Sequence, residues 1–273
     1  MLYIKVLVFI LFLVHIPVIA YPGWVITEEG VDGYGNRSIQ TTFIQKNVIR
    51  YETSASIVII DLNSNKVTIV FSQYKAYWNG TSEELKQGTI SIYDMQMEKM
   101  LAGLPKHNQK ELDSIYQDIR QKMLNPNNYK PLYDISINKT NNIQEVFGYD
   151  AVRYDIFVDS ILIESLWHTT EVSPYNDVDI GDMLVFMRQL DYKSSQNSIM
   201  QKDEYVDLLK TGMLLKSIEY LPNSNKLETK VTNIREIDII SDFFLPPKNY
   251  IEVSLVDALY LIPNSDLQMG NYD

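Results

Sequence analysis

Residues able to do acid–base or nucleophilic chemistry are sparse in this sequence. The chain of 273 residues has no cysteine, and beyond its first twenty residues it keeps two histidines, His107 and His168. It contains no Gly-x-Ser-x-Gly nucleophile motif, no His-Glu-x-x-His metal motif and no glycine-rich phosphate loop. Hydrolysis by paired carboxylates is a remaining alternative, but no pair is indicated by its spacing. We therefore expect a protein that is not an enzyme, with no catalytic residue, bound metal or cofactor.

One acidic cluster needs to be weighed as a calcium site. Asp177, Asp179 and Asp182 lie within six residues of one another. A calcium-binding loop of the helix–loop–helix type needs glycine at its sixth position and glutamate at its twelfth. Counted from Asp177, these positions hold Asp182 and Arg188. The spacing therefore predicts capping of a helix rather than calcium binding.

Methionine and tryptophan are the side chains best suited to an apolar ligand. Flexible thioethers could form a lid over such a ligand, or they could fill gaps in the core, and six of the ten methionines lie in expected helices: Met95, Met97, Met100, Met123, Met183 and Met187. Two tryptophans end expected strands, where they could line a pocket mouth or seal the end of the sheet. The candidate ligand-binding residues are Trp78, Tyr93, Met97, Met100, Trp167 and Met187.

Strand patterns dominate the chain. Residues 57–62 and 67–71 form an expected hairpin around Asn63-Ser64-Asn65, and residues 151–158 and 161–167 form another around Asp159-Ser160. Further strands are expected over residues 38–46, 48–53, 131–138, 213–220 and 227–237. The last of these is polar on much of both faces, so we expect an exposed or edge position for it.

Two helical zones interrupt the strands. Thr81 followed by Glu84 has the capping-box pattern and opens a helix toward Leu104, and a second helix follows Pro105. The other helical zone begins near Asp179 or Asp182. Because the strands come in hairpin-linked blocks, the order predicts an α+β protein with an antiparallel sheet.

The first twenty residues resemble a secretory signal peptide. Lys5 precedes the apolar run Val6–Val14, which is shorter than a membrane span, and Ala20 is a small residue at a plausible cleavage point. We expect a signal peptide over 1–20, a single domain over 21–262 and a polar tail over 263–273, in an extracytoplasmic (periplasmic or secreted) protein. An uncleaved anchor helix is the alternative. The net charge of −11 argues against nucleic acid or an anionic membrane as partner.

Several short motifs together resemble a known family. They are Tyr77–Thr81, Gly148–Tyr149 leading into Tyr154–Asp159, Glu164 with Trp167, and Asp242–Pro247 before Tyr250. They resemble an exported bacterial family of unknown function that is similar to the periplasmic lipoprotein-carrier (LolA-like) superfamily. The resemblance implies a strongly curved antiparallel sheet, an incomplete barrel, with helices covering its concave face. The long helix pair over 81–123 departs from the pattern, and would fill the concavity.

Two functions follow as hypotheses. The first is an exported, non-enzymatic binding protein that holds a lipid, acyl chain or other hydrophobic ligand between the curved sheet and the helices. The second is a structural or interaction protein of the cell envelope with a filled core and no small ligand. The expected partners are accordingly a hydrophobic small molecule or lipid, or an envelope protein, and we expect no stable membrane span after signal cleavage.

Overall fold

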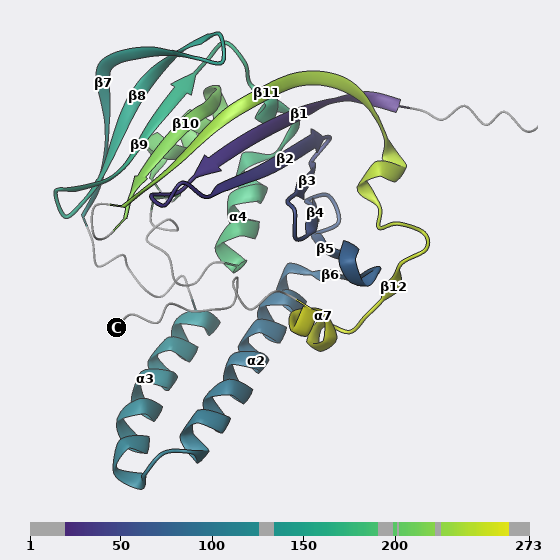
Figure 1. Cartoon of the computed structure of the whole chain (residues 1–273), viewed down its shortest axis with the longest axis vertical. Coiled ribbons are helices and arrows are strands. Elements are labelled where there is room, and N and C mark those ends of the chain that lie inside the picture. Colours follow the sequence, from purple (N-terminus) through teal and green to yellow (C-terminus); the bar gives the residue numbers. More distant parts are fainter. Residues whose placement is uncertain (1–19, 126–133, 191–198, 201, 222–224, 262–273) are drawn as a thin grey trace, which may run out of the picture.

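Twelve strands form one large, mostly antiparallel sheet (Figure 1). The computed structural model describes residues 20–125, 134–190, 199–200, 202–221 and 225–261; the predicted tail and all but the last residue of the predicted signal peptide lie outside this part. The strand order is β12-β6-β5-β4-β3-β2-β1-β11-β10-β9-β8-β7. The sheet arches but does not close into a barrel, because β7 and β12 remain as its two edges. The predicted α+β class with an antiparallel sheet is confirmed.

One half of the sheet is a meander of short strands. These are β2 (Arg37–Gln45), β3 (Val48–Glu52), β4 (Ile57–Asp61), β5 (Lys66–Phe71) and β6 (Ala76–Thr81). The first predicted hairpin is confirmed as β4–β5, in which Ile60 lies opposite Val67. The strand β12 (Ile251–Glu252) adds to β6 in parallel, the one parallel pairing among the described strands.

The other half is built from β7 (Ile135–Val146), β8 (Tyr149–Val158), β9 (Ile161–Thr169) and β10 (Met213–Tyr220). The second predicted hairpin is confirmed, since Val158 pairs with Ile161 across a two-residue turn. Both turn residues have positive φ, 49° at Asp159 and 68° at Ser160, which matches the twist of an antiparallel hairpin. Phe147 and Gly148 make the same kind of turn between β7 and β8, with φ of 51° and 80°.

Two long strands join these halves. The strand β1 (Ala20–Val31) pairs with β11 (Lys226–Ile240) along its whole length, and β11 lies between β1 and β10. Of the two predicted alternatives for this strand, the edge position is wrong, whereas exposure is confirmed, since most of its side chains are exposed or half-buried. Its polar side chains are accommodated in the middle of the sheet because they pair with neighbouring strands, as Lys230 does with Glu29 and Glu228 does with Lys216.

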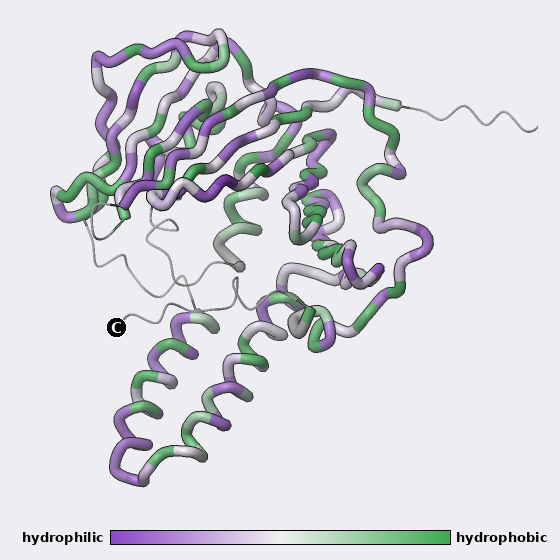
Figure 2. The backbone as a smooth tube through the Cα atoms, in the orientation of Figure 1, coloured by the Kyte–Doolittle hydropathy of each residue, from purple (hydrophilic) through white to green (hydrophobic). Residues whose placement is uncertain are grey.

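Short helices pack on one face of the sheet. They are η3 (Pro174–Asp177), α4 (Ile180–Leu190) and α6 (Asp203–Thr211), while α7 (Leu255–Leu261) packs beside β6. Phe186 of α4 shares an apolar cluster with Trp78 and with Ala258 of α7, and Figure 2 shows α4 among the most hydrophobic segments. The predicted helix cap is confirmed for Asp179, whose Oδ1 accepts a hydrogen bond from the backbone N–H of Asp182 at 3.0 Å.

The helices α2 (Ser82–Ala102) and α3 (Lys106–Leu124) project from the sheet as an antiparallel pair, here called the helical arm (Figure 1). The capping box of Thr81 and Glu84 is confirmed at the start of α2. The expectation that this pair fills the concavity is wrong. The two helices bury their apolar side chains against each other, around Ile90, Tyr93, Met97 and Met123. Near the start of α2, Leu85 packs on the sheet cluster around Trp78, and farther along the arm the apolar side chains face the partner helix.

Candidate functional site

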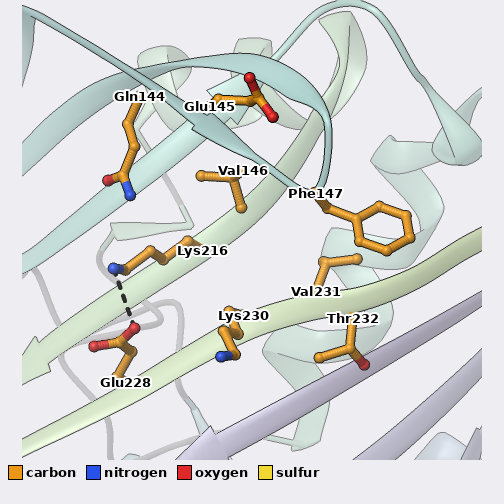
Figure 3. A pocket seen from close by; sticks show the side chains of 9 residues that line it. All are labelled: Gln144, Glu145, Val146, Phe147, Lys216, Glu228, Lys230, Val231 and Thr232. Atoms are coloured by element: carbon orange, nitrogen blue, oxygen red, sulfur yellow. Dashed lines mark ion pairs between the residues drawn. The ribbon is translucent and has the colours of Figure 1, made fainter.

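A pocket of about 500 Å³ lies where the β7–β8 turn approaches β10 and β11 (Figure 3). We call it the turn pocket. Since β7 and β11 are separated by three strands in the sheet, only the strong curl of this half brings them together. Val146 and Val231, one from each side, belong to the same buried apolar cluster. The lining residues are Gln144, Glu145, Val146, Phe147, Lys216, Glu228, Lys230, Val231 and Thr232.

Irregular pairing in two strands shapes this pocket. The β1–β11 register shifts so that Thr232 is an extra residue on β11, and the β9–β10 register shifts so that Leu215 is extra on β10. Bulges of this kind turn side chains out of strict alternation. As a result, the consecutive residues Val231 and Thr232 both line the pocket. The hydroxyl of Thr232 donates to the carbonyl oxygen of Thr27 at 3.2 Å.

Four charged side chains line the turn pocket, and all of them except Glu145 are held in ion pairs with described residues. Lys216 Nζ lies 3.1 Å from Glu228 Oε1 and 5.0 Å from the ring centroid of Trp167 (Figure 3 shows the ion pair). The Lys216 side chain is only 16% exposed, so both its ion pair and its contact with the ring are stronger than at an open surface. Lys230 Nζ lies 3.8 Å from Glu29 Oε2. The pocket thus offers fixed charges of both signs.

Trp167 supports this wall from below. Its ring lies under Lys216 and also under Arg153, whose guanidinium carbon is 5.5 Å from the ring centroid. Trp167 is 5% exposed, and its Nε1–H has no hydrogen-bond partner in the described part of the chain. An unpaired buried donor costs about 1–3 kcal/mol. Trp167 is not among the residues that line the turn pocket, but its ring contacts Lys216, which does. That Trp167 borders a ligand site remains a prediction.

The other predicted ligand residues lie elsewhere. Trp78 and Met187 meet in the apolar cluster under α4. Tyr93 and Met97 are buried inside the helical arm, while Met100 is 53% exposed near its end. The structure therefore brings four of these residues together as two pairs, and it does not gather all six in one place. Their role as ligand contacts remains a prediction.

A second, smaller pocket is apolar. It has a volume of about 170 Å³ and is lined by Phe43, Phe243 and the β11 residues Ile237, Asp238, Ile239 and Ile240. The rings of Phe43 and Phe243 meet edge to face with centroids 4.6 Å apart. Arg50 fixes one wall, since it donates to the carbonyl of Phe243 at 2.5 Å and lies over its ring. A cavity of about 150 Å³ binds a single benzene ring, so this pocket has room for one ring-sized group.

A line of titratable side chains lies on the face of the sheet that α6 and η3 cover. Burial and the negative charge of Glu28 raise the pKa of Tyr51 to about 12. Burial also raises the pKa of Glu28 itself and, further still, that of Tyr175. The side chains of Glu28, Tyr51 and Tyr175 are half-buried, and the protein around them removes enough water to shift their pKa values. They are therefore enclosed by surrounding protein while part of their surface remains accessible.

Glu164 is the most perturbed carboxyl group of this face. It lies directly opposite Glu219 in the β9–β10 pairing, and burial together with the charge of Glu219 raises its pKa to about 7. Like charges at directly opposite positions repel. Its negative charge in turn adds to the effect of burial in raising the pKa of Tyr205 of α6 well above the ordinary value of 10.

The candidate histidine has a structural environment. His168 is buried, and its Nε2 donates to the carbonyl oxygen of Leu208 at 2.9 Å, which ties α6 to β9. Burial lowers its pKa, so the ring is neutral at physiological pH. Within the described ranges, no three His, Asp or Glu side chains gather as metal ligands. No helix in that part of the chain is both long and apolar enough to span a membrane.

Comparisons with known proteins give only distant likenesses. No family model and no curated protein matches the chain. Two solved structures of PNGF-II, in space groups C2 and P21, are 12% identical with TM-scores of 0.38 and 0.37; they match 89% of this chain, which spans a third (33%) of theirs. The LolA superfamily protein NE2245 from Nitrosomonas europaea is 7% identical with a TM-score of 0.24, over 84% of this chain and 90% of that one. At these scores the likenesses establish neither a family nor an activity.

Proposed function

We propose that this chain is a non-enzymatic binding protein whose ligand is a small polar molecule held in the turn pocket. The observation that carries the proposal is the pocket itself, about 500 Å³ with polar and apolar groups facing one space. Ligand sites for small molecules have volumes of about 300–1,000 Å³ and combine an apolar wall with a few fixed polar groups. Both features are present at this site.

The lining chemistry narrows the ligand class. The amide of Gln144 and the hydroxyl of Thr232 offer uncharged hydrogen-bonding groups, while Phe147, 44% exposed, offers an apolar surface. The lining lysines Lys216 and Lys230 are balanced by Glu145 and Glu228, so no excess charge selects an ionic ligand. A purely apolar ligand would bury the polar groups without partners, at an unfavourable desolvation cost. An uncharged polar molecule with one apolar side fits best.

The same groups support a binding role rather than catalysis. An oxygen nucleophile needs an adjacent general base, whereas Thr232 donates its proton to a backbone carbonyl. The ammonium group of Lys216 is already engaged, by the Glu228 carboxylate and by the face of the Trp167 ring. The signal-peptide pattern of the first twenty residues supports an extracytoplasmic place of action.

A second candidate function is the carriage of a lipid or other hydrophobic ligand between the sheet and the helices. The observation that favours it is the set of half-buried, desolvated side chains on the helix-covered face, including Tyr51, Tyr175 and Tyr205. The apolar pocket at Phe43 is not part of this space, because Phe43 pairs with Arg50 while its neighbour Thr42 pairs with Tyr51, so Phe43 and Tyr51 lie on opposite faces of the sheet.

Two measurements separate these functions. In a thermal-shift screen, an uncharged polar ligand is expected to raise the Tm of the wild type, and less so in a double variant Gln144→Ala/Thr232→Val. Phe43→Ala, in the apolar pocket, is the matched control and should keep the ligand response. Native mass spectrometry of the purified chain gives the second measurement. A co-purifying acyl species that survives in the double variant would replace the first proposal by the second.

A further inference from the structure

Phe147 is an unusual residue for the turn that it occupies. It is the first of the two turn residues between β7 and β8, and its φ is 51°. In this left-handed region the Cβ of an L-residue crowds the following carbonyl oxygen, so two-residue hairpin turns favour asparagine, aspartate and glycine. Among the seven non-glycine residues with positive φ in the described part of the chain, Phe147 alone is apolar. The chemistry of the turn therefore does not account for this side chain.

Packing in the core does not account for Phe147 either. Its side chain is 44% exposed, and Gly148 beside it has open space where a Cβ would stand. The ring of Tyr149 lies 6.5 Å away between centroids, which is near the outer limit for an aromatic pair. Phe147 instead lines the turn pocket (Figure 3). An exposed apolar side chain that is held in a strained conformation at a pocket points to a role in binding.

The turn pocket has an apolar end and a polar end. Phe147 and Val231 lie at one end of the lining in Figure 3. Gln144, Lys216 and Glu228 lie at the other end. This polar end mixes donors with acceptors, because an ammonium group donates, a carboxylate accepts and an amide does both. A matching ligand presents a C–H surface on one side and groups that both donate and accept hydrogen bonds on the other.

A sugar ring meets these requirements. Each of its hydroxyl groups can donate and accept a hydrogen bond, and its C–H groups form an apolar face that stacks on the negative face of an aromatic ring. A nucleobase fits less well, because its donors and acceptors lie in one plane, whereas the polar groups of the pocket come from three strands, β7, β10 and β11. The two lysines and two glutamates of the lining leave no excess charge for an ionic ligand.

We propose that the turn pocket binds a neutral saccharide, and that the exposed ring of Phe147 stacks on the C–H face of the sugar. The inference rests on the proposed function, because it names the ligand class of the same pocket. It also explains why an aromatic residue stands where asparagine would fit the backbone better. Replacing Phe147 should therefore weaken binding and stabilise the fold at the same time.

The first test is isothermal titration and saturation-transfer NMR of the full chain with glucose, galactose, mannose, N-acetylglucosamine, maltose and cellobiose. At least one sugar should bind, with the strongest saturation on the C–H protons of one face. Tighter binding of a disaccharide than of its monosaccharide would identify the source as a glycan chain rather than a free sugar. Phe147→Asn should weaken the affinity about ten-fold, because the stacked ring is lost. Phe147→Tyr restores a ring and should recover most of that loss.

The second test is the thermal stability of the same variants. Phe147→Asn should raise the Tm by about 2–4 °C, since asparagine adopts the left-handed conformation more easily than phenylalanine. The matched control is Tyr74→Asn, which removes a 56% exposed ring in η1 (Ser72–Tyr74), outside the pocket lining. It should change neither the affinity for the sugar nor the Tm.

Three results would overturn the inference. A lower Tm in Phe147→Asn would show that the ring is kept for packing, and an unchanged sugar affinity in that variant would exclude stacking. The third is binding of the neutral non-sugars uracil or nicotinamide, lost in Gln144→Ala/Thr232→Val, while no sugar binds. That result would exclude a saccharide and leave the proposed function standing. The proposed function fails as well only if no uncharged polar molecule in the thermal-shift screen depends on Gln144 and Thr232.

Discussion

Lys216 lies against the face of Trp167, with its Nζ 5.0 Å from the ring centroid and 3.1 Å from Glu228 Oε1. The two interactions hold an ammonium group at a fixed place in the wall of the turn pocket. Lys216→Met should therefore destabilise the protein by about 1–2 kcal/mol, since it removes a partly buried ion pair and a cation–π contact. Urea unfolding measures the change. The control is Lys226→Met, which removes a comparable contact with Tyr220 away from the pocket. An equal loss of stability in this control would show that the ion pair and ring contact of Lys216 do not stabilise the fold more than an ordinary surface contact.

Glu164 should make the protein less stable as the pH rises toward neutrality. Its pKa of about 7 in the fold lies above the ordinary value of 4.5, so the folded state binds more protons between these values and stability falls as the pH passes from 4.5 to 7. Glu164→Gln removes this loss and should gain about 2–3 kcal/mol at pH 8 and almost nothing at pH 4. Unfolding in urea at both pH values gives the comparison, with the exposed Glu236→Gln as control. An equal gain at both pH values would contradict the assignment.

Met123 and Met100 give a matched pair in the helical arm. Met123 is 2% exposed in the seam between α2 and α3, whereas Met100 lies on the outside. Met123→Ala should cost about 2–5 kcal/mol in the arm, and Met100→Ala should cost almost nothing. Hydrogen exchange should show the loss in α2 and α3 while the amides of β8 and β9 keep their protection. Uniform loss across the sheet would mean that the arm does not have an independent core.

The capping box at the start of α2 has a measurable share in stability. Thr81 Oγ1 accepts from the backbone N–H of Glu84 at 3.1 Å, and the Glu84 carboxylate accepts from the Thr81 N–H at 2.7 Å. Thr81→Ala should destabilise the protein by about 1 kcal/mol and speed exchange in the first turn of α2. Ser114→Ala, at an exposed position within α3, changes no cap and should be neutral.

Local features of the fold were predictable from the sequence because each depends on neighbouring residues. The Thr81–Glu84 cap and the Asp159-Ser160 turn need only a few positions of chain, and both are confirmed. The central place of β11 was not predictable, since exposed polar residues such as Lys230 fit an edge strand equally well until their partners on other strands are known. The direction of the helical arm likewise depends on whether the apolar stripes of α2 and α3 pack on each other or on the sheet. The sequence shows each stripe but not the surface on which it packs.

The turn pocket could not have been predicted from the sequence. Gln144 and Lys216 meet only because the sheet curls, and the extra residues Leu215 and Thr232 leave no mark in the sequence pattern. Of the β7–β8 turn, only Gly148 was noted, as part of the Gly148–Tyr149 motif of the family resemblance, and Phe147 was not singled out. Glu164 was noted for the same reason, while its charge opposite Glu219 depends on the register of β9 with β10.

The pairing of β1 with β11 also bears on how the chain folds. Ala20 lies opposite Ile240, so the middle of the sheet is completed by two strands from near the two ends of the described chain. During synthesis β1 has no partner on this side until more than two hundred further residues have been made. Contacts of such sequence separation slow folding. We therefore expect the two halves of the sheet to form first as separate meanders and to join only after β11 has been made.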